Sequence, residues 1–241
     1  MPRSKWAPRS FSICPLTANV HGMQAVIFDL DGVLVDSERI WDEVRRSVVA
    51  EHGGAWRDDA TRAQQGMSTP EWARYLVETL GAKLTPERIA EVVVDEMARR
   101  YAGGPPVIEG AEATVRAVAA RWPVAIASSS PPVLIRAFLN ATGLASLVPV
   151  AVSSEEVRAG KPAPDVYLKA AAMLAVDPTK CAAVEDTTNG LRAALAAGMS
   201  VYAVPNPHFP PDPAVLAQVT AVIREISALP AALESRSEAS R

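Results

Sequence analysis

Two aspartates, Asp29 and Asp31, directly follow an apolar run at residues 25–28, and Gly32 comes next. A short, continuous apolar run is typical of a strand buried on both faces, as in a parallel sheet. Because the aspartates are two positions apart, extended backbone points both carboxylates to the same side. Burying carboxylates is costly, so we expect the pair to face a cleft and to hold a cation. A polar turn that closes the strand is the alternative.

Three serines, Ser128, Ser129 and Ser130, follow a second apolar segment at residues 123–127. A hydroxyl at such a strand end, together with the backbone N–H groups that follow it, can hold phosphate oxygens. Serines are also common in ordinary loops, so this run alone leaves both interpretations open.

Lys161 is followed by Pro162 and Pro164, which restrict the backbone beside it. Most isolated lysines simply lie on the surface, so the flanking prolines are what single this one out.

Glu185 and Asp186 are adjacent carboxylates after another apolar segment at residues 182–184. They could stabilise the N-terminus of a following helix. If the fold instead brings them close to Asp29, the cluster offers the oxygen ligands that Mg²⁺ prefers.

Taken together and in this order, the segments 28–37, 126–130, 161–165 and 184–190 resemble the four motifs of the haloacid dehalogenase (HAD) superfamily. The similarity is greatest to the branch that holds β-phosphoglucomutase and the small sugar-phosphate phosphatases. The resemblance implies an α/β fold: a Rossmann-like, doubly wound parallel sheet with an α-helical cap domain inserted after the first strand.

The same resemblance implies a role for each motif residue. Asp29 is expected to be the nucleophile that accepts a phosphoryl group, and Asp31 the general acid and then the general base. Lys161 bridges the nucleophile and the phosphoryl group, while Ser128 and Ser129 bind phosphate oxygens.

A metal site is also implied, with Mg²⁺ held by Asp29, by Asp31 through its backbone carbonyl, and by Asp186. Glu185 is a further candidate ligand. Some relatives hold the corresponding Lys-Pro peptide bond in the cis form, so the bond at 161–162 is expected to be cis.

The hydrophobic pattern predicts how the chain is organised around these motifs. Helical spacing and the start signals at Thr69-Pro70 and Thr85-Pro86 indicate a helical block, and strands alternate with helices beyond it. This alternation favours a mostly parallel sheet with its ligands at the carboxyl ends of the strands. The predicted domains are a poorly ordered extension (1–22), a core (23–37 and 105–232), a cap (38–104) and a frayed tail (233–241).

Composition narrows the class of partner. The 241 residues carry a net charge of −3, which provides no basic surface for nucleic acid. No apolar run approaches the ~18 residues that cross a membrane. Cys14 and Cys181 are isolated, which argues against a disulfide framework or a zinc site and fits a reducing cytoplasm. We therefore expect a cytoplasmic protein that binds a small phosphorylated metabolite, and nothing in the sequence requires more than a monomer.

Two departures from the mutase pattern favour hydrolysis over phosphoryl transfer between positions of a sugar. Trp41 stands where the mutases have a histidine, and residues 66–69 lack the arginine that could clamp a second phosphate. Residues 36–41 instead resemble hexose-phosphate phosphatases. We predict a phosphatase, with a β-phosphoglucomutase-like phosphomutase as the alternative. A phospho-accepting signalling receiver would lack the insertion at 38–104.

Residues of the cap that could touch the substrate are harder to choose. Trp41, Arg45 and Gln65 are the candidates, with Gln64 and Trp72 also possible. Each could equally serve in packing of the cap or lie on its surface.

Overall fold

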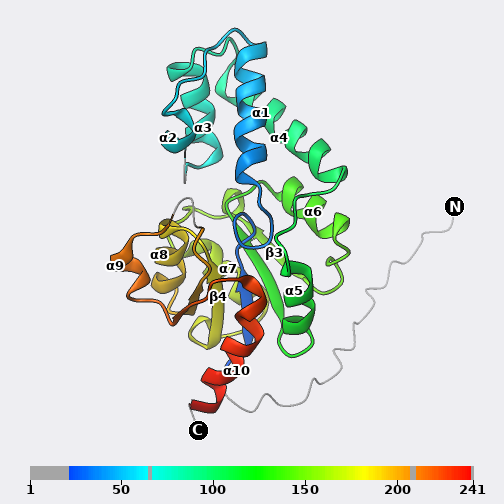
Figure 1. Cartoon of the computed structure of the whole chain (residues 1–241), viewed down its shortest axis with the longest axis vertical. Coiled ribbons are helices and arrows are strands. Elements are labelled where there is room, and N and C mark those ends of the chain that lie inside the picture. Colours follow the sequence, from blue (N-terminus) through cyan, green and yellow to red (C-terminus); the bar gives the residue numbers. More distant parts are fainter. Residues whose placement is uncertain (1–21, 65–66, 207–209, 240–241) are drawn as a thin grey trace, which may run out of the picture.

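The computed structural model describes residues 22–64, 67–206 and 210–239, and these ranges are drawn in colour in Figure 1. A sheet with helices on both sides forms the lower part of the molecule, and a group of helices stands above it (Figure 1). The extension predicted over 1–22 falls outside the described residues except for Gly22.

A six-stranded parallel sheet lies at the centre of the lower part, in the order β3-β2-β1-β4-β5-β6. The first two aspartates follow β1, which lies next to the middle of the sheet. The chain builds the sheet outward from this strand, first towards β2 and β3 on one side and then towards β4, β5 and β6 on the other, so the direction reverses between β1 and β4. Parallel sheets bind ligands at the carboxyl ends of strands beside such a reversal. The strands are β1 (Ala25–Phe28), β2 (Val124–Ser128), β3 (Val150–Ser153), β4 (Cys181–Glu185), β5 (Ser200–Ala203) and β6 (Ala221–Val222).

Alternate residues of β1 pack into two separate hydrophobic clusters, one on each face of the sheet. Val26 and Phe28 belong to the first cluster, and Ala25 and Ile27 to the second, all with no exposed surface. Burial on both faces accounts for the continuous apolar run in the sequence.

Helices cover both of these faces, so the sheet is doubly wound and the predicted fold class is confirmed. Residues of α5, α6 and α10 pack into the first cluster, and residues of α7, α8 and α9 into the second. The bounds are α5 (Ala111–Ala119), α6 (Pro132–Ala141), α7 (Asp165–Met173), α8 (Thr188–Ala196), α9 (Pro213–Leu216) and α10 (Leu229–Ala239), with 3₁₀ turns at Ser154–Glu156, Pro178–Lys180 and Ile226–Ala228.

The segment between β1 and α5 folds into the helices that stand above the sheet, which we call the cap. Its α4 packs against α6 of the core, and buried residues of the cap continue the first hydrophobic cluster. The elements are α1 (Glu38–Glu51), α2 (Ala60–Ala63), α3 (Thr69–Arg74), a π-helical turn (Tyr75–Thr79) and α4 (Pro86–Ala102). The short α2 has no counterpart in the sequence-based expectation, whereas the π-helical turn continues the helix expected from Thr69-Pro70 onward.

Start signals in the cap are partly confirmed. Thr85 is the N-cap of α4, where its hydroxyl accepts a hydrogen bond from the backbone N–H of Arg88 at 3.3 Å. The start of α3 lies one residue earlier than expected, because Ser68 is the N-cap and its N–H donates to the Glu71 carboxylate at 2.7 Å.

The chain end also differs from the expectation of a frayed tail over 233–241. It is helical as far as Ala239, because Leu229 and Leu233 are buried against the first hydrophobic cluster. Within the described ranges, no helix combines the length and the apolar character needed to cross a membrane.

The two connections between cap and core run side by side. The backbone N–H of Asp36 donates to the carbonyl of Pro106 at 2.8 Å, and that of Ile108 donates to Leu34 at 3.0 Å. The cap therefore joins the core directly beside the end of β1.

The central strands should tolerate cavities poorly. Ile126 in β2 is fully buried, and we expect Ile126→Ala to lower the free energy of unfolding by about 2–5 kcal/mol. Met173 in α7 is 54% exposed, so Met173→Ala should change it by no more than about 0.5 kcal/mol. Urea unfolding followed by circular dichroism measures both, and equal losses in the two variants would contradict this account of the core.

Candidate active site

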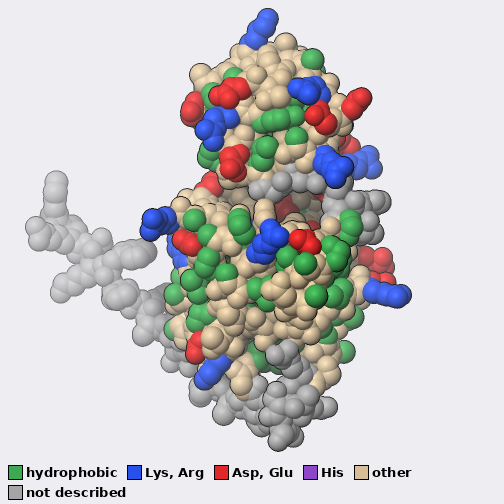
Figure 2. Space-filling view, turned by 90° about the vertical axis from the view of Figure 1, so that its left-hand side faces the viewer, with side chains coloured by type: hydrophobic (Ala, Val, Ile, Leu, Met, Phe, Trp, Pro, Cys, Tyr) green, Lys and Arg blue, Asp and Glu red, His purple; other side chains and the backbone are tan. Residues whose placement is uncertain are grey.

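A cavity of about 790 Å³ opens between the cap and the carboxyl ends of the strands. Figure 2 shows acidic side chains inside the recess that separates the two lobes of the molecule. Asp29 and Asp31 follow β1, Lys161 lies in the loop after β3, and Asp186 follows β4; all four line this cavity. The structure thus brings together residues from segments more than a hundred positions apart, as the sequence predicted.

Lys161 connects two of the acidic motifs. Its ammonium nitrogen Nζ lies 2.7 Å from Asp29 Oδ1 and 2.6 Å from Glu185 Oε1. The three side chains are at most 8% exposed, so little water screens these contacts. The Lys161–Pro162 peptide bond is cis, as the resemblance implied.

Glu185 is held by hydrogen bonds to both of its carboxylate oxygens. The hydroxyl of Tyr167 donates to Oε1 at 2.9 Å, and the backbone N–H groups of Asp186 and Thr187 donate to Oε2 at 3.0 and 3.2 Å. Tyr167, on the buried face of α7, was not recognised in the sequence, where it looks like any aromatic residue of a buried helix face.

Burial is the main cause of the raised pKa values of Asp29 and Asp186. It raises the pKa of Asp29 to about 7, since Glu185 and Asp31 add to the effect of burial and Lys161 only partly opposes it. Burial, Glu185 and Asp29 raise the pKa of Asp186 well above its usual value. Burial lowers the pKa of Lys161, but the carboxylates of Asp29 and Glu185 outweigh that effect and raise it. Three carboxyl groups thus share one lysine, and burial and their mutual repulsion disfavour the charged forms of Asp29 and Asp186.

The excess of carboxyl groups over basic ones fits a divalent cation. Carboxylate oxygens of Asp29, Glu185 and Asp186 lie within 4.8 Å of one another. Asp186 Oδ1 is buried and accepts no hydrogen bond from any described residue. A bound cation would supply the missing partner of that oxygen, and hard divalent ions prefer such oxygen donors.

Two glycines leave the space that the acidic side chains occupy. A Cβ atom on Gly32 would lie 1.9 Å from Asp186 Oδ2, and Gly32 also has a φ of +79°, which disfavours other residues. A Cβ atom on Gly190 would lie 1.8 Å from Glu185 Oε1. The cluster thus depends on glycine in two separate motifs.

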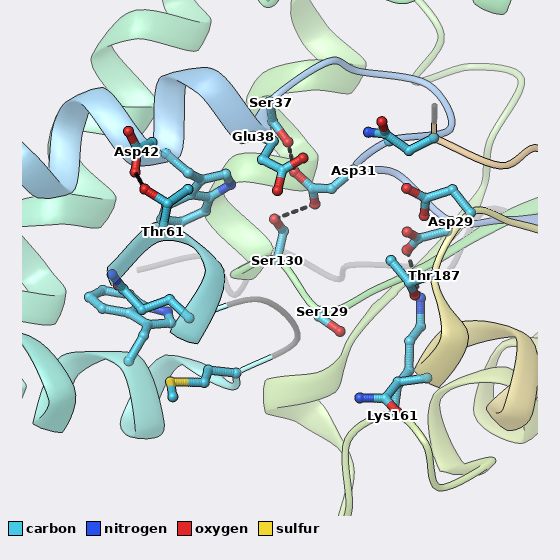
Figure 3. Close-up of a pocket in the computed structure, with 18 of the residues that line it drawn as sticks. Asp29, Asp31, Ser37, Glu38, Asp42, Thr61, Ser129, Ser130, Lys161 and Thr187 are labelled. Carbon is cyan, nitrogen blue, oxygen red and sulfur yellow. Dashed lines mark hydrogen bonds and ion pairs between the residues drawn. The ribbon is translucent and has the colours of Figure 1, made fainter. Parts of the chain in front are cut away.

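Asp31 lies apart from the acidic cluster and is held by serine hydroxyls (Figure 3). The hydroxyl of Ser37 donates to Asp31 Oδ1, and that of Ser130 donates to Oδ2 at 2.6 Å. The hydroxyl of Ser128 also donates to Oδ2, at 3.4 Å. Ser130 had no role in the sequence-based prediction, although it belongs to the same run of three serines. These contacts fix the direction of the Asp31 carboxyl group.

The predicted phosphate ligands differ in their access to the cavity. Ser129 is exposed and lies in the cavity wall, whereas Ser128 has no exposed surface and its Oγ accepts a hydrogen bond from Ser130 N at 2.9 Å. The hydroxyl of Ser128 is thus turned to Asp31 and to its own loop.

Part of the cap wall comes from residues that the sequence marked as candidates. Trp41, Gln64 and Trp72 line the cavity together with Arg45, while Gln65 lies outside the described residues.

Replacement of Gly190 tests the close approach of Glu185. Alanine usually stabilises a helix by about 1 kcal/mol relative to glycine. Here we expect Gly190→Ala to lower the free energy of unfolding by about 1–3 kcal/mol, because the new methyl group would overlap the buried carboxylate. Gly103→Ala is the control, since its Cβ atom would lie 3.4 Å from its nearest neighbour, the backbone oxygen of Arg100. A Gly190→Ala variant as stable as the wild type in urea would contradict the packing described here.

Comparisons with known proteins agree with this geometry. The phosphorylated carbohydrates phosphatase of Thermotoga maritima is 33% identical over 187 residues, which cover 76% of this chain and 85% of that protein. Hexitol phosphatase B of Escherichia coli K12 is 33% identical over 203 residues, covering 81% and 90%. The crystal structure of a HAD family hydrolase from Deinococcus radiodurans R1, with bound phosphate and sodium, superposes with a TM-score of 0.64 at 30% identity and covers 89% of this chain and 96% of that one.

The family assignment rests on sequence and structure together. A model of the haloacid dehalogenase-like hydrolases matches residues 23–198, which include every motif of the candidate site. The chain therefore belongs to the haloacid dehalogenase-like hydrolase family.

Proposed function

We propose that the protein hydrolyses the phosphomonoester of a small metabolite, a sugar phosphate, through a phosphorylated Asp29. The observation that carries the proposal is the contact of 2.7 Å between Lys161 Nζ and Asp29 Oδ1 inside a cavity at the carboxyl ends of the strands. The names of the relatives, a phosphorylated carbohydrates phosphatase and a hexitol phosphatase, support the substrate class.

In the first half of the reaction, a carboxylate oxygen of Asp29 attacks phosphorus. A bond forms between that oxygen and phosphorus while the bond from phosphorus to the leaving alcohol breaks. Lys161 offsets negative charge on the nucleophile and the transferred phosphoryl oxygens. Asp31, oriented by Ser37 and Ser130, gives its proton to the leaving oxygen.

In the second half, water attacks the phosphorus of the aspartyl-phosphate. Asp31 is now a carboxylate and accepts the proton of that water, so it returns to its starting state. Inorganic phosphate leaves, and the Asp29 carboxylate is restored. Exposed Ser129 is the better placed of the two predicted serines to bind phosphoryl oxygens from the cavity side, and Ser128 acts through its contacts with Asp31 and with the loop.

We further propose Mg²⁺ as the metal, held by Asp29, Asp186 and the backbone carbonyl of Asp31. When bound, the ion offsets the negative charge of the carboxylates and of the phosphoryl group. Glu185, although it belongs to the same cluster, is already engaged by Lys161 and Tyr167. We therefore assign to Glu185 the positioning of Lys161 rather than direct ligation.

Hydrolysis is favoured over the mutase alternative by the cap. Trp41 lies in the cavity wall at the position where the mutase pattern has a histidine, and it contacts the Trp72 ring at 6.1 Å between centroids. An indole at this point cannot exchange a proton with a sugar hydroxyl. A cytoplasmic location and a monomeric state remain predictions from composition.

Removal of the nucleophile should abolish turnover. We expect Asp29→Asn to reduce phosphate release by about a thousand-fold or more across a panel of sugar phosphates, since the amide is a poor nucleophile. Asp95→Asn, an exposed acid on α4, should match the wild type. Unchanged turnover in Asp29→Asn would exclude the covalent route, and isomerised product from β-glucose 1-phosphate with its bisphosphate would favour the mutase.

Metal dependence is tested separately. Incubation with EDTA followed by desalting should reduce phosphate release to background, because the uncompensated carboxylates then repel the phosphoryl group. Added Mg²⁺ should restore activity, whereas K⁺ at the same ionic strength should not. Full activity of the chelated protein would argue against a metal in this site.

A further inference from the structure

Arg45 occupies an unusual place on the cap side of the cavity. Its guanidinium carbon Cζ lies 4.7 Å from the ring centroid of Trp41 and 4.8 Å from that of Trp72. The two indole rings are inclined by 57° to each other, and the guanidinium packs against both of them. With the indole rings packed against it, the guanidinium can bind other groups mainly through the N–H donors of its edge.

Apart from the two indole rings, the described residues provide no hydrogen-bond or ion-pair partner for this cation. Its Nε–H is buried and donates no hydrogen bond, and within the described ranges no carboxylate forms an ion pair with it. Burial lowers the pKa of Arg45 to about 10, although the charges of Asp42, Asp31 and Glu38 oppose this effect. Asp42 already accepts hydrogen bonds from Thr61 and from Arg46, the latter at 2.6 Å.

Gln64 supplies an unpartnered acceptor to the same cavity. Its side chain is 3% exposed, and its amide Nε2 donates to the carbonyl oxygen of Ala60 at 3.0 Å. Because the Ala60 carbonyl can only accept a hydrogen bond, the end of the Gln64 amide that faces it must be the NH₂ group. The other end, Oε1, is buried and accepts nothing from any described residue.

A ligand is the natural source of the missing partners. A buried polar atom without a hydrogen bond is costly, and Arg45 and Gln64 both line the cavity that ends at Asp29 and Lys161. Hydroxyl groups can satisfy either residue, since a hydroxyl oxygen accepts from arginine and a hydroxyl proton goes to the glutamine oxygen. A second anionic group satisfies only the arginine.

The charge around Arg45 also disfavours an anion. Three carboxylates, of Asp31, Glu38 and Asp42, are close enough to affect its titration. Acidic groups at this end of the cavity repel a second phosphate or carboxylate on the substrate, whereas they do not repel hydroxyl groups.

We propose that Arg45 and Gln64 determine specificity by binding hydroxyl groups of the leaving alcohol, so that monophosphates of polyhydroxylated alcohols are preferred to phosphate esters with a second anionic group. This inference rests on the proposed phosphatase function and assigns the selection of its substrate to two residues of the cap.

Three substrates test the assignment: sorbitol 6-phosphate, phosphoglycolate and p-nitrophenyl phosphate. We expect Arg45→Met to lower kcat/KM for sorbitol 6-phosphate by about 10- to 100-fold, mainly through KM, and to change that for p-nitrophenyl phosphate by less than about threefold. Gln64→Met should show the same selective loss. Arg39→Met, whose side chain is 86% exposed on the same helix, should match the wild type on all three.

Arg45→Lys separates hydrogen bonding from packing. It keeps the positive charge and the aliphatic stem but loses the buried Nε–H, so its loss should again be confined to sorbitol 6-phosphate. Equal losses on all three substrates would overturn the proposal, as would a wild-type preference for phosphoglycolate that Arg45→Met abolishes. Absence of phosphate release from every substrate would instead contradict the phosphatase function itself.

Discussion

The ammonium group of Lys161, fixed between the carboxylates of Asp29 and Glu185, is the interaction on which the site depends. Buried ion pairs seldom add much stability, because the cost of removing both charges from water offsets their attraction. This one is also incomplete, since Asp186 adds a carboxylate that the lysine does not reach. The cluster is therefore suited to partners that arrive from outside, a cation and a phosphoryl group, and less to holding the fold together.

The rest of the core can be understood as the means of holding that cluster. Parallel strands β1 and β4 are neighbours, so the residues that follow them emerge together at one edge of the sheet. Gly32 and Gly190 then allow the acidic side chains to approach without overlap. Hydrophobic clusters on both faces fix the strands, so the positions of these groups follow from burial of apolar residues elsewhere.

How far the sequence predicts this arrangement depends on the kind of signal each residue leaves. Asp29 and Lys161 stand out because charge beside a buried strand or between prolines needs an explanation. Tyr167 and Ser130 leave no such signal, since a buried tyrosine and a loop serine are ordinary, and only the fold shows that they bind Glu185 and Asp31. The final helix was missed for a similar reason: its sequence is small and polar, and two buried leucines anchor it.

The positions of residues in the cap are constrained less strictly than those in the core. Residues that do chemistry must stand at fixed points of a shared sheet edge, whereas α1 presents a face of the cap on which Trp41 and Arg45 are one turn apart. We expect a substitution on that face to change what contacts the leaving alcohol without moving Asp29 or Lys161. Because a binding contact and a catalytic contact are then separate in the chain, the choice of substrate can change while the reaction stays the same.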